Sequence, residues 1–235
     1  MNAAILLAAG RGSRMRNSVT DKILYEVGGC TLFAKSLLAF REAAVASLWV
    51  VTYRDESQKE RLANDITKMV PDDVDVILVE GGEERRHSVQ NALAKIPPET
   101  EIVFVHDCAR PMIEAKSLTK LLSVAIETGG AALAHPVRDT LKQTREGQGP
   151  HPIAHHTVDR SKLWAVETPQ TFQAELLREG LARAVSENLS VTDETSAVEL
   201  LGHPVSLVDP GYPNPKVTTP SDLSYIEFLI NKDNA

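Results

Sequence analysis

The regular alternation of short apolar runs with amphipathic segments is the feature that most constrains the fold of this chain. Apolar runs occupy residues 5–7, 48–53, 74–80, 101–107 and 131–137, and segments with a helical period separate them at residues 31–47, 56–70, 85–96 and 117–129. Parallel strands need crossover connections of this kind, and the helices cover the faces of the sheet that results. The pattern therefore predicts an α/β fold with a doubly wound, mostly parallel sheet, formed by residues 1–235 as one domain.

The alternation stops at His135. The stretch that follows has no helical period, and its Gly- and Pro-rich centre lies between two strand-like pieces, which predicts a protruding β-hairpin arm at about residues 136–162. His151, His155 and His156 lie on this arm without a carboxylate or cysteine pattern, so solvated histidines are favoured over a metal site. Beyond the arm we expect helices at 168–188 and 192–202, strands at 204–209 and 216–219, and a closing helix from Pro220.

A glycine turn that is rich in cations follows the first apolar run. Gly10 and Gly12 permit backbone conformations that side chains forbid, so a ligand can approach closely, and exposed N–H groups there suit an anion such as phosphate. The nearby cations are Arg11, Arg14, Arg16 and Lys22. Met15 stands where a dinucleotide-binding fingerprint needs its third glycine, and the P-loop pattern is absent from the sequence. The alternative is a tight strand-to-helix turn with solvated basic residues.

The overall charge and composition limit the partners of the chain. A formal net charge of -7 argues against general binding to nucleic acid or to a membrane surface, so the N-terminal cations form a local group. The sequence contains neither a signal-peptide pattern nor an apolar run of about 18 residues, and we expect a cytoplasmic protein. Cys30 and Cys108 form no CxxC pair and are expected to be small buried thiols.

Polar residues also follow the other predicted strands. The third apolar run precedes Gly81, Gly82, Arg85 and Ser88, the fourth precedes Arg110 and ends at Asp107, and the later ones lead to Thr140 and Lys216. Ligands of a doubly wound sheet bind at the carboxyl ends of its strands. Each residue alone has an ordinary structural explanation. Together, the glycine turns, one acid and several cations describe a site for a polyphosphate with a cation.

Seven sequence blocks in a fixed order resemble a known family. They are LLAAGRGSRM, GGEERRHSV, HDCARP, PVRDTLK, TVDRSKLWAVETPQTF, TDETSAVE and KVTTPSDL. In this order, and over nearly its whole length, the chain resembles the 2-C-methyl-D-erythritol 4-phosphate cytidylyltransferases of isoprenoid biosynthesis. The resemblance implies a nucleotidyltransferase that joins CTP and methylerythritol phosphate into a CDP-alcohol and pyrophosphate, with the substrate phosphate attacking the α-phosphorus in line. Such catalysis depends mostly on positioning and on neutralising charge.

The resemblance implies roles for the residues at the triphosphate. Arg14 and Lys22 would meet the triphosphate and the developing charge, and the turn that cradles the phosphates would comprise Ala8, Ala9, Gly10 and Gly12. Family members usually place Pro-Lys-Gln around the lysine matched by Lys22, whereas this chain has TDKIL. The loop between Arg14 and Lys22 is therefore expected to follow a path of its own.

The resemblance likewise implies how the nucleoside is held. Gly81, Gly82 and Ser88 would contact the base, largely through backbone groups that distinguish the amino group of cytosine from the carbonyl group of uracil. Arg85 would support this turn. Asp107 would lie near the ribose and the hydration shell of a Mg²⁺ cofactor, with Asp209 as a second metal candidate that can equally start a turn.

The second substrate is expected to lie beside the nucleotide. Arg110 would lie next to Asp107, Lys216 would face the reacting phosphate, and Thr140 and Arg160 would hold methylerythritol phosphate. In this family the last two reach across from the arm of a partner chain, so the resemblance implies a homodimer.

Two alternatives to this function remain open from the sequence. One is a ribitol 5-phosphate cytidylyltransferase, which has a similar fold and acts on a different alcohol. The other is a degenerate nucleotide-binding protein without turnover, which the altered surroundings of Lys22 and the Pro215 before Lys216 would suit.

Overall fold

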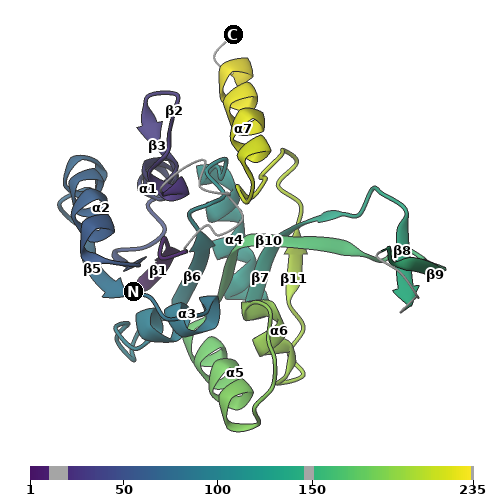
Figure 1. Ribbon diagram of the computed structural model, residues 1–235. Helices are drawn as coiled ribbons and strands as arrows, with labels where there is room; N and C mark the ends of the chain where they lie inside the picture. The colour runs from purple at the N-terminus through teal and green to yellow at the C-terminus, as the bar shows by residue number, and fades with distance from the viewer. Residues whose placement is uncertain (11–20, 146–150, 234–235) are drawn as a thin grey trace.

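A seven-stranded, mostly parallel sheet forms the centre of the molecule (Figure 1). The computed structural model describes residues 1–10, 21–145 and 151–233. The strands, in their spatial order, are β11 (Ser206–Val208), β7 (Gly130–Pro136), β10 (Trp164–Gln173), β6 (Ile102–Asp107), β1 (Asn2–Leu7), β4 (Leu48–Tyr53) and β5 (Asp75–Glu80). Neighbouring strands are parallel except where β10 pairs antiparallel with β6 and β7. The predicted fold class is confirmed.

Helices cover both faces of this sheet, as the doubly wound pattern predicts. Alternate residues of β1 point to opposite faces, so that Leu6 joins one core cluster and Ile5 joins the other. The helices over the Leu6 face are α1 (Leu32–Ala43), α2 (Glu56–Met69) and α4 (Ala115–Thr128). The helices over the Ile5 face are α3 (Arg85–Leu93), α5 (Ala174–Ser186) and α6 (Glu194–Glu199), which lie together below the sheet in Figure 1. Two hydrophobic cores thus pack against the two faces of the sheet.

Small elements between β1 and α1 support the closing helix. A 3-10 turn, η2 (Lys22–Leu24), precedes the short hairpin of β2 (Glu26–Val27) and β3 (Cys30–Thr31). Val27 of this hairpin packs with Leu223 and Ile226 of α7 (Pro220–Asp233) in a third cluster. Cys30 is only partly buried here, whereas the predicted burial of Cys108 is complete and raises the pKa of its thiol.

Two expected elements are wrong. Residues 168–173, expected to begin a helix, belong to β10, whose Phe172 is fully buried in the core on the Ile5 face, and the helix begins at Ala174. Residues 216–219, expected to form a strand, have no strand pairing. The amides of Thr218 and Thr219 instead donate to Asp222 at the start of α7. In both places long-range packing or capping overrides the local pattern.

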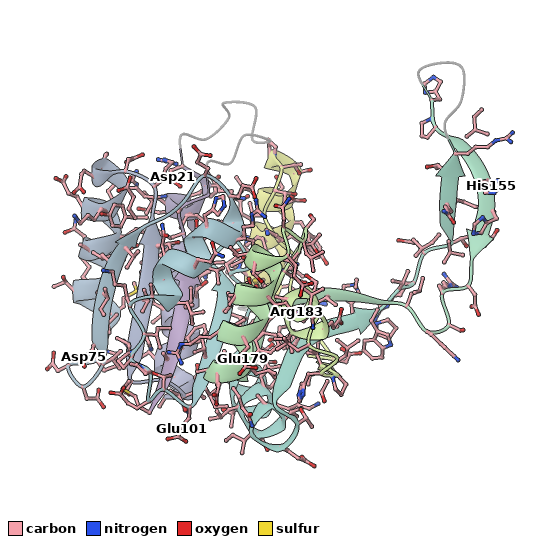
Figure 2. The ribbon with its side chains drawn as sticks, turned by 90° about the horizontal axis from the view of Figure 1, so that it is seen from below. Asp21, Asp75, Glu101, His155, Glu179 and Arg183 are labelled. Carbon is pink, nitrogen blue, oxygen red and sulfur yellow. The ribbon has the colours of Figure 1, made fainter. Side chains whose placement is uncertain are left out.

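Two strands outside the main sheet project from the body of the molecule. β8 (Leu141–Arg145) and β9 (Ile153–Val158) pair antiparallel, and Figure 2 shows them with His155 far from the helices. Their side chains are almost all exposed. Within the described residues, no helix is long and apolar enough to cross a membrane.

Candidate nucleotide-binding site

A cavity of about 570 Å³ opens at the carboxyl ends of four adjacent strands. Its walls come from the residues at or just after the ends of β1, β4, β5 and β6, together with η2 and the segment before α7. The chain proceeds from β1 outward to β4 and β5 and then returns to place β6 on the other side of β1. The cavity therefore lies where the strand order reverses, which is the usual ligand site of such sheets.

The turn after β1 forms one edge of the cavity. The amides of Ala8 and Ala9 both approach the Oγ1 atom of Thr52 in β4, at 3.2 and 3.4 Å. Ala9 and Gly10 line the cavity. Gly12 and Arg14, which were also predicted to meet the phosphates, lie outside the described residues.

The turn after β5 needs glycine at two positions. A Cβ atom on Gly81 would lie 2.4 Å from the Cβ of Ala9, and one on Gly82 would lie 2.2 Å from the Cβ of His87. The amide of Gly82 donates to Ser88 Oγ at 3.0 Å, and Ser88 is buried. Because Gly81 and Gly82 have no side chains, the turn after β5 can lie against the turn after β1, and its backbone groups face the cavity wall.

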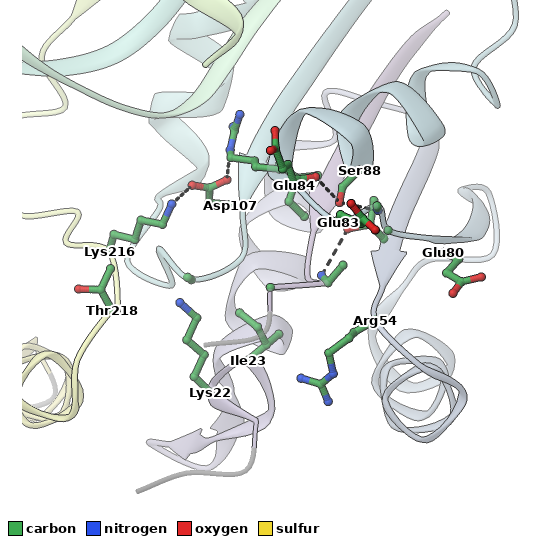
Figure 3. Close-up of a pocket in the computed structure, with 18 residues that line it drawn as sticks. Lys22, Ile23, Arg54, Glu80, Glu83, Glu84, Ser88, Asp107, Lys216 and Thr218 are labelled. Atoms are coloured by element: carbon green, nitrogen blue, oxygen red, sulfur yellow. Dashed lines mark hydrogen bonds and ion pairs between the residues drawn. The ribbon is translucent and has the colours of Figure 1, made fainter. Parts of the chain in front are cut away.

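Asp107 lies between two cations at the end of β6. Arg85 Nε donates to Asp107 Oδ1 at 3.0 Å, and Lys216 Nζ donates to Oδ2, as the dashed lines in Figure 3 mark. Burial opposes ionisation of this carboxyl, but the charges of Arg85 and Lys216 outweigh it and hold the pKa of Asp107 well below its usual range. Asp107 is therefore a fixed anion that orients both cations.

Arg85 has a second carboxylate partner that the sequence did not indicate. Its guanidinium makes two 2.7 Å hydrogen bonds to Glu194 at the start of α6, and that side chain is only 2% exposed. Burial raises the pKa of Glu194, while Glu194 and Asp107 more than offset the effect of burial on Arg85 and raise its pKa. Glu194 stands in the TDETSAVE block, but a pairing across 109 residues leaves no local sequence signal.

Lys22 and Arg54 complete the cationic part of the cavity. Lys22 Nζ donates to the carbonyl oxygen of Val217 at 2.8 Å, which places its ammonium group near the segment that carries Lys216. Figure 3 shows Arg54 across the cavity from Lys216. Arg54, which the sequence prediction missed, pairs with the buried Asp21 at 3.2 Å.

Three predicted substrate residues do not line this cavity. Arg110 is directed to the other side of the strand end, where its Nη1 donates to the carbonyl oxygen of Asn214 at 2.8 Å and lies 4.0 Å from Glu167. Thr140 and Arg160 are exposed and flank the strands of the projecting hairpin. Asp209 accepts a hydrogen bond from the amide of Gly211 at 2.8 Å, as a residue that starts a turn does.

The cations and glycine turns of this cavity suit the binding of an extended polyanion. Lysine and arginine side chains reach it from four segments of the chain, and the glycine turns expose backbone groups beside them. The profile of the 2-C-methyl-D-erythritol 4-phosphate cytidylyltransferases matches residues 2–232. The chain belongs to this family.

Individual cytidylyltransferases are similar over the full chain. The 2-C-methyl-D-erythritol 4-phosphate cytidylyltransferase of Geobacillus kaustophilus is 38% identical over 231 residues, which are 97% of this chain and 96% of that protein. The crystal structure of the Thermus thermophilus enzyme is 31% identical, covers 97% of this chain and 98% of its own, and has a TM-score of 0.75. A synthase structure from Anaerococcus prevotii, 21% identical with a TM-score of 0.83 and 98% coverage of both chains, supports the fold. The similarity to these proteins thus extends over nearly the whole chain.

Proposed function

We propose that this cavity is the active site of a cytidylyltransferase that transfers CMP from CTP to 2-C-methyl-D-erythritol 4-phosphate. As a member of that family the chain is a nucleotidyltransferase of isoprenoid biosynthesis. The observation that carries the assignment to this cavity is Asp107, held between Arg85 and Lys216 beside two glycine turns at the reversal of strand order. We also propose a cytoplasmic location, where CTP is available.

The reaction forms one P–O bond and breaks another. An oxygen of the methylerythritol phosphate attacks the α-phosphorus of CTP, and the bond to the bridging oxygen of pyrophosphate breaks as pyrophosphate leaves. Lys22 and Lys216 stabilise the negative charge that develops on the phosphate oxygens, and Asp107 keeps Lys216 oriented toward it. The residues of the β5 turn, Gly81 to Ser88, contact the cytosine base through backbone groups.

We propose Mg²⁺ as the cofactor, in a role that suits the side chains present. Both oxygens of Asp107 already accept from cations, and the described residues contain no group of three or more His, Cys, Asp or Glu side chains that could hold a metal ion. A carboxylate keeps further lone pairs, so Asp107 can accept hydrogen bonds from water in the metal's hydration shell. Mg²⁺ keeps several waters and binds substrate phosphates, where it neutralises charge.

The projecting hairpin supports a homodimer in which each site uses two chains. Thr140 and Arg160 flank β8 and β9 and do not line the cavity of their own chain, and Ile153, Trp164 and Val166 on the hairpin and its base are each more than a third exposed. Such an arm leaves both its apolar and its polar groups available to a second copy. We propose that Thr140 and Arg160 hold methylerythritol phosphate in the partner's cavity.

Substrate dependence tests the proposed reaction. Pyrophosphate release should require CTP, Mg²⁺ and methylerythritol phosphate together. Release with ribitol 5-phosphate instead would reassign the alcohol, and binding of CTP without pyrophosphate release under any condition would make the chain a nucleotide-binding protein.

Complementation tests the shared site. Lys216→Ala and Arg160→Ala should each be nearly inactive, but after subunit exchange in equal amounts one site of a mixed dimer carries both lesions and the other carries neither. About half of the dimers are then mixed, so activity should rise to about a quarter of wild type. If exchange is demonstrated and activity stays at the level of the separate variants, Arg160 acts within its own chain.

A further inference from the structure

One buried amide side chain, that of Gln58, connects the start of the glycine turn with the η2 turn. Gln58 is 2% exposed and lies in the first turn of α2. Its Nε2 atom donates to the carbonyl oxygen of Ala8 at 3.2 Å and to Asp21 Oδ2 at 2.7 Å. Ala8 directly follows β1, and Asp21 directly precedes η2. A single side chain outside the cavity therefore ties the end of β1 to the residue before Lys22.

Asp21 extends the same network toward the cavity. Its Oδ1 accepts from the amide of Ile23 at 3.1 Å and so caps the η2 turn, which begins at Lys22. Its Oδ2 also pairs with Arg54, and the amide of Arg54 donates to Gln58 Oε1 at 2.7 Å. Both amide hydrogens of Gln58, its carbonyl oxygen and both oxygens of Asp21 are thus engaged by protein groups.

This arrangement has the properties of a preorganising device. Burying a carboxylate and an amide is costly unless every polar atom finds a partner, and a fully satisfied network holds its members in one geometry. A binding loop whose ends are fixed beforehand loses less conformational freedom when the ligand arrives. The same hydrogen bonds set the position of the turn that carries Lys22.

We infer that Gln58 and Asp21, here called the Gln58–Asp21 clamp, are positioning residues for the triphosphate of CTP. This inference rests on the proposed function and deepens it. The clamp acts through the glycine turn and Lys22, without touching the nucleotide, and it holds them in the geometry that receives the phosphates. Its effect is expected on CTP, because the hydrogen bonds of the clamp reach Ala8, Ile23 and Arg54, whereas Arg110 bonds to Asn214.

The test compares Gln58→Met with a matched loss of hydrogen bonds elsewhere. Methionine keeps the length and burial of Gln58 but can neither donate to Ala8 and Asp21 nor accept from Arg54. The control is Thr128→Val, since Thr128 Oγ1 donates to the carbonyl oxygens of Val124 and Gly130 at the amino end of β7, away from the cavity. Thermal unfolding, the Kd for CTP from calorimetry, kcat and both KM values are measured for each.

The expected result is selective for the nucleotide. In Gln58→Met the Kd and KM for CTP should rise about tenfold, the loss expected for one or two buried hydrogen bonds, while the KM for methylerythritol phosphate stays at the wild-type value. Thr128→Val should lose thermal stability but bind CTP as wild type does. Asp21→Ala should repeat the effect, and the double variant should lose no more than the larger single loss, because both changes break one network.

Wild-type affinity for CTP in folded Gln58→Met and Asp21→Ala proteins would overturn the inference. So would equal rises in the KM values of both substrates, which indicate a general distortion. The proposed function is tested separately by turnover of the wild-type protein, because the Kd for CTP reports on the clamp whether or not the wild type releases pyrophosphate.

Discussion

Replacing Glu194 by Gln isolates the charge of the carboxylate that holds Arg85. The two side chains share a pair of 2.7 Å hydrogen bonds, and the exposed fractions are 2% for Glu194 and 28% for Arg85. Breaking a buried ion pair by changing one partner costs about 3–5 kcal/mol, because the other charge stays behind without compensation. Arg85 keeps Asp107 and some contact with solvent, so we expect a loss of about 3 kcal/mol in the free energy of unfolding, at the lower end of that range.

A second Arg–Glu pair provides the control. Arg183 and Glu187 form a 2.8 Å pair on the surface of α5, with exposed fractions of 46% and 48%. Glu187→Gln should lower the free energy of unfolding by only about 0.5 kcal/mol. Urea titrations followed by circular dichroism measure both variants against wild type. Equal losses in the two variants, or a loss below about 1 kcal/mol for Glu194→Gln, would refute the reasoning that burial decides the strength of this pair.

Three further predictions concern the site and the strand beneath it. Lys216→Ala should lower kcat by about 10²–10³, as expected for one lost charge stabiliser, with a wild-type circular dichroism spectrum; normal turnover would remove Lys216 from catalysis. If backbone groups from Gly81 to Ser88 contact the base, kcat/KM for UTP should be at least about tenfold below that for CTP in a pyrophosphate assay, and similar values would move the base site elsewhere. Burial lowers the pKa of His106 to about 3. Between pH 6 and pH 5 the unfolded chain therefore binds a proton at His106 that the folded chain does not, and the free energy of unfolding should fall by about 1 kcal/mol over this interval. His106→Gln should abolish that part of the pH dependence, and an unchanged slope would contradict it.

The sequence predicted those parts of the fold that local patterns determine. Apolar runs marked β1, β4, β6 and β7 because strands buried on both faces need apolar residues at almost every position. The antiparallel strand β10 was not predicted, because its segment TPQTFQ combines polar residues with a proline and resembles the start of a helix. Its strand conformation depends on the open position between β6 and β7, which is a property of the whole sheet.

In the site, too, residues marked by a local pattern were predicted, whereas residues defined by distant partners were not. Asp107 and Lys216 were predicted to lie at one sheet edge, and the structure brings them into direct contact, since the end of a parallel strand can be located from sequence. Glu194, Arg54 and the Gln58–Asp21 clamp were missed because their partners lie far away in the chain. Arg110 follows the same strand as Asp107, but its side chain takes the opposite direction, which residue spacing alone cannot reveal.

The position of β10 between β6 and β7 determines the order in which the strands of the sheet can pair during synthesis. β6, β1, β4 and β5 are all complete once Asp107 has been synthesised, and their parallel pairing needs no later residue. β7 follows after α4, but it has no neighbour on the β6 side until β10 has inserted between them. A growing chain that has passed Pro136 but has not reached Gln173 therefore carries an open edge on β6, ready to pair with a foreign strand. Chains stalled in this window should be the aggregation-prone species during synthesis, and shortening the interval between β7 and β10 should reduce that hazard.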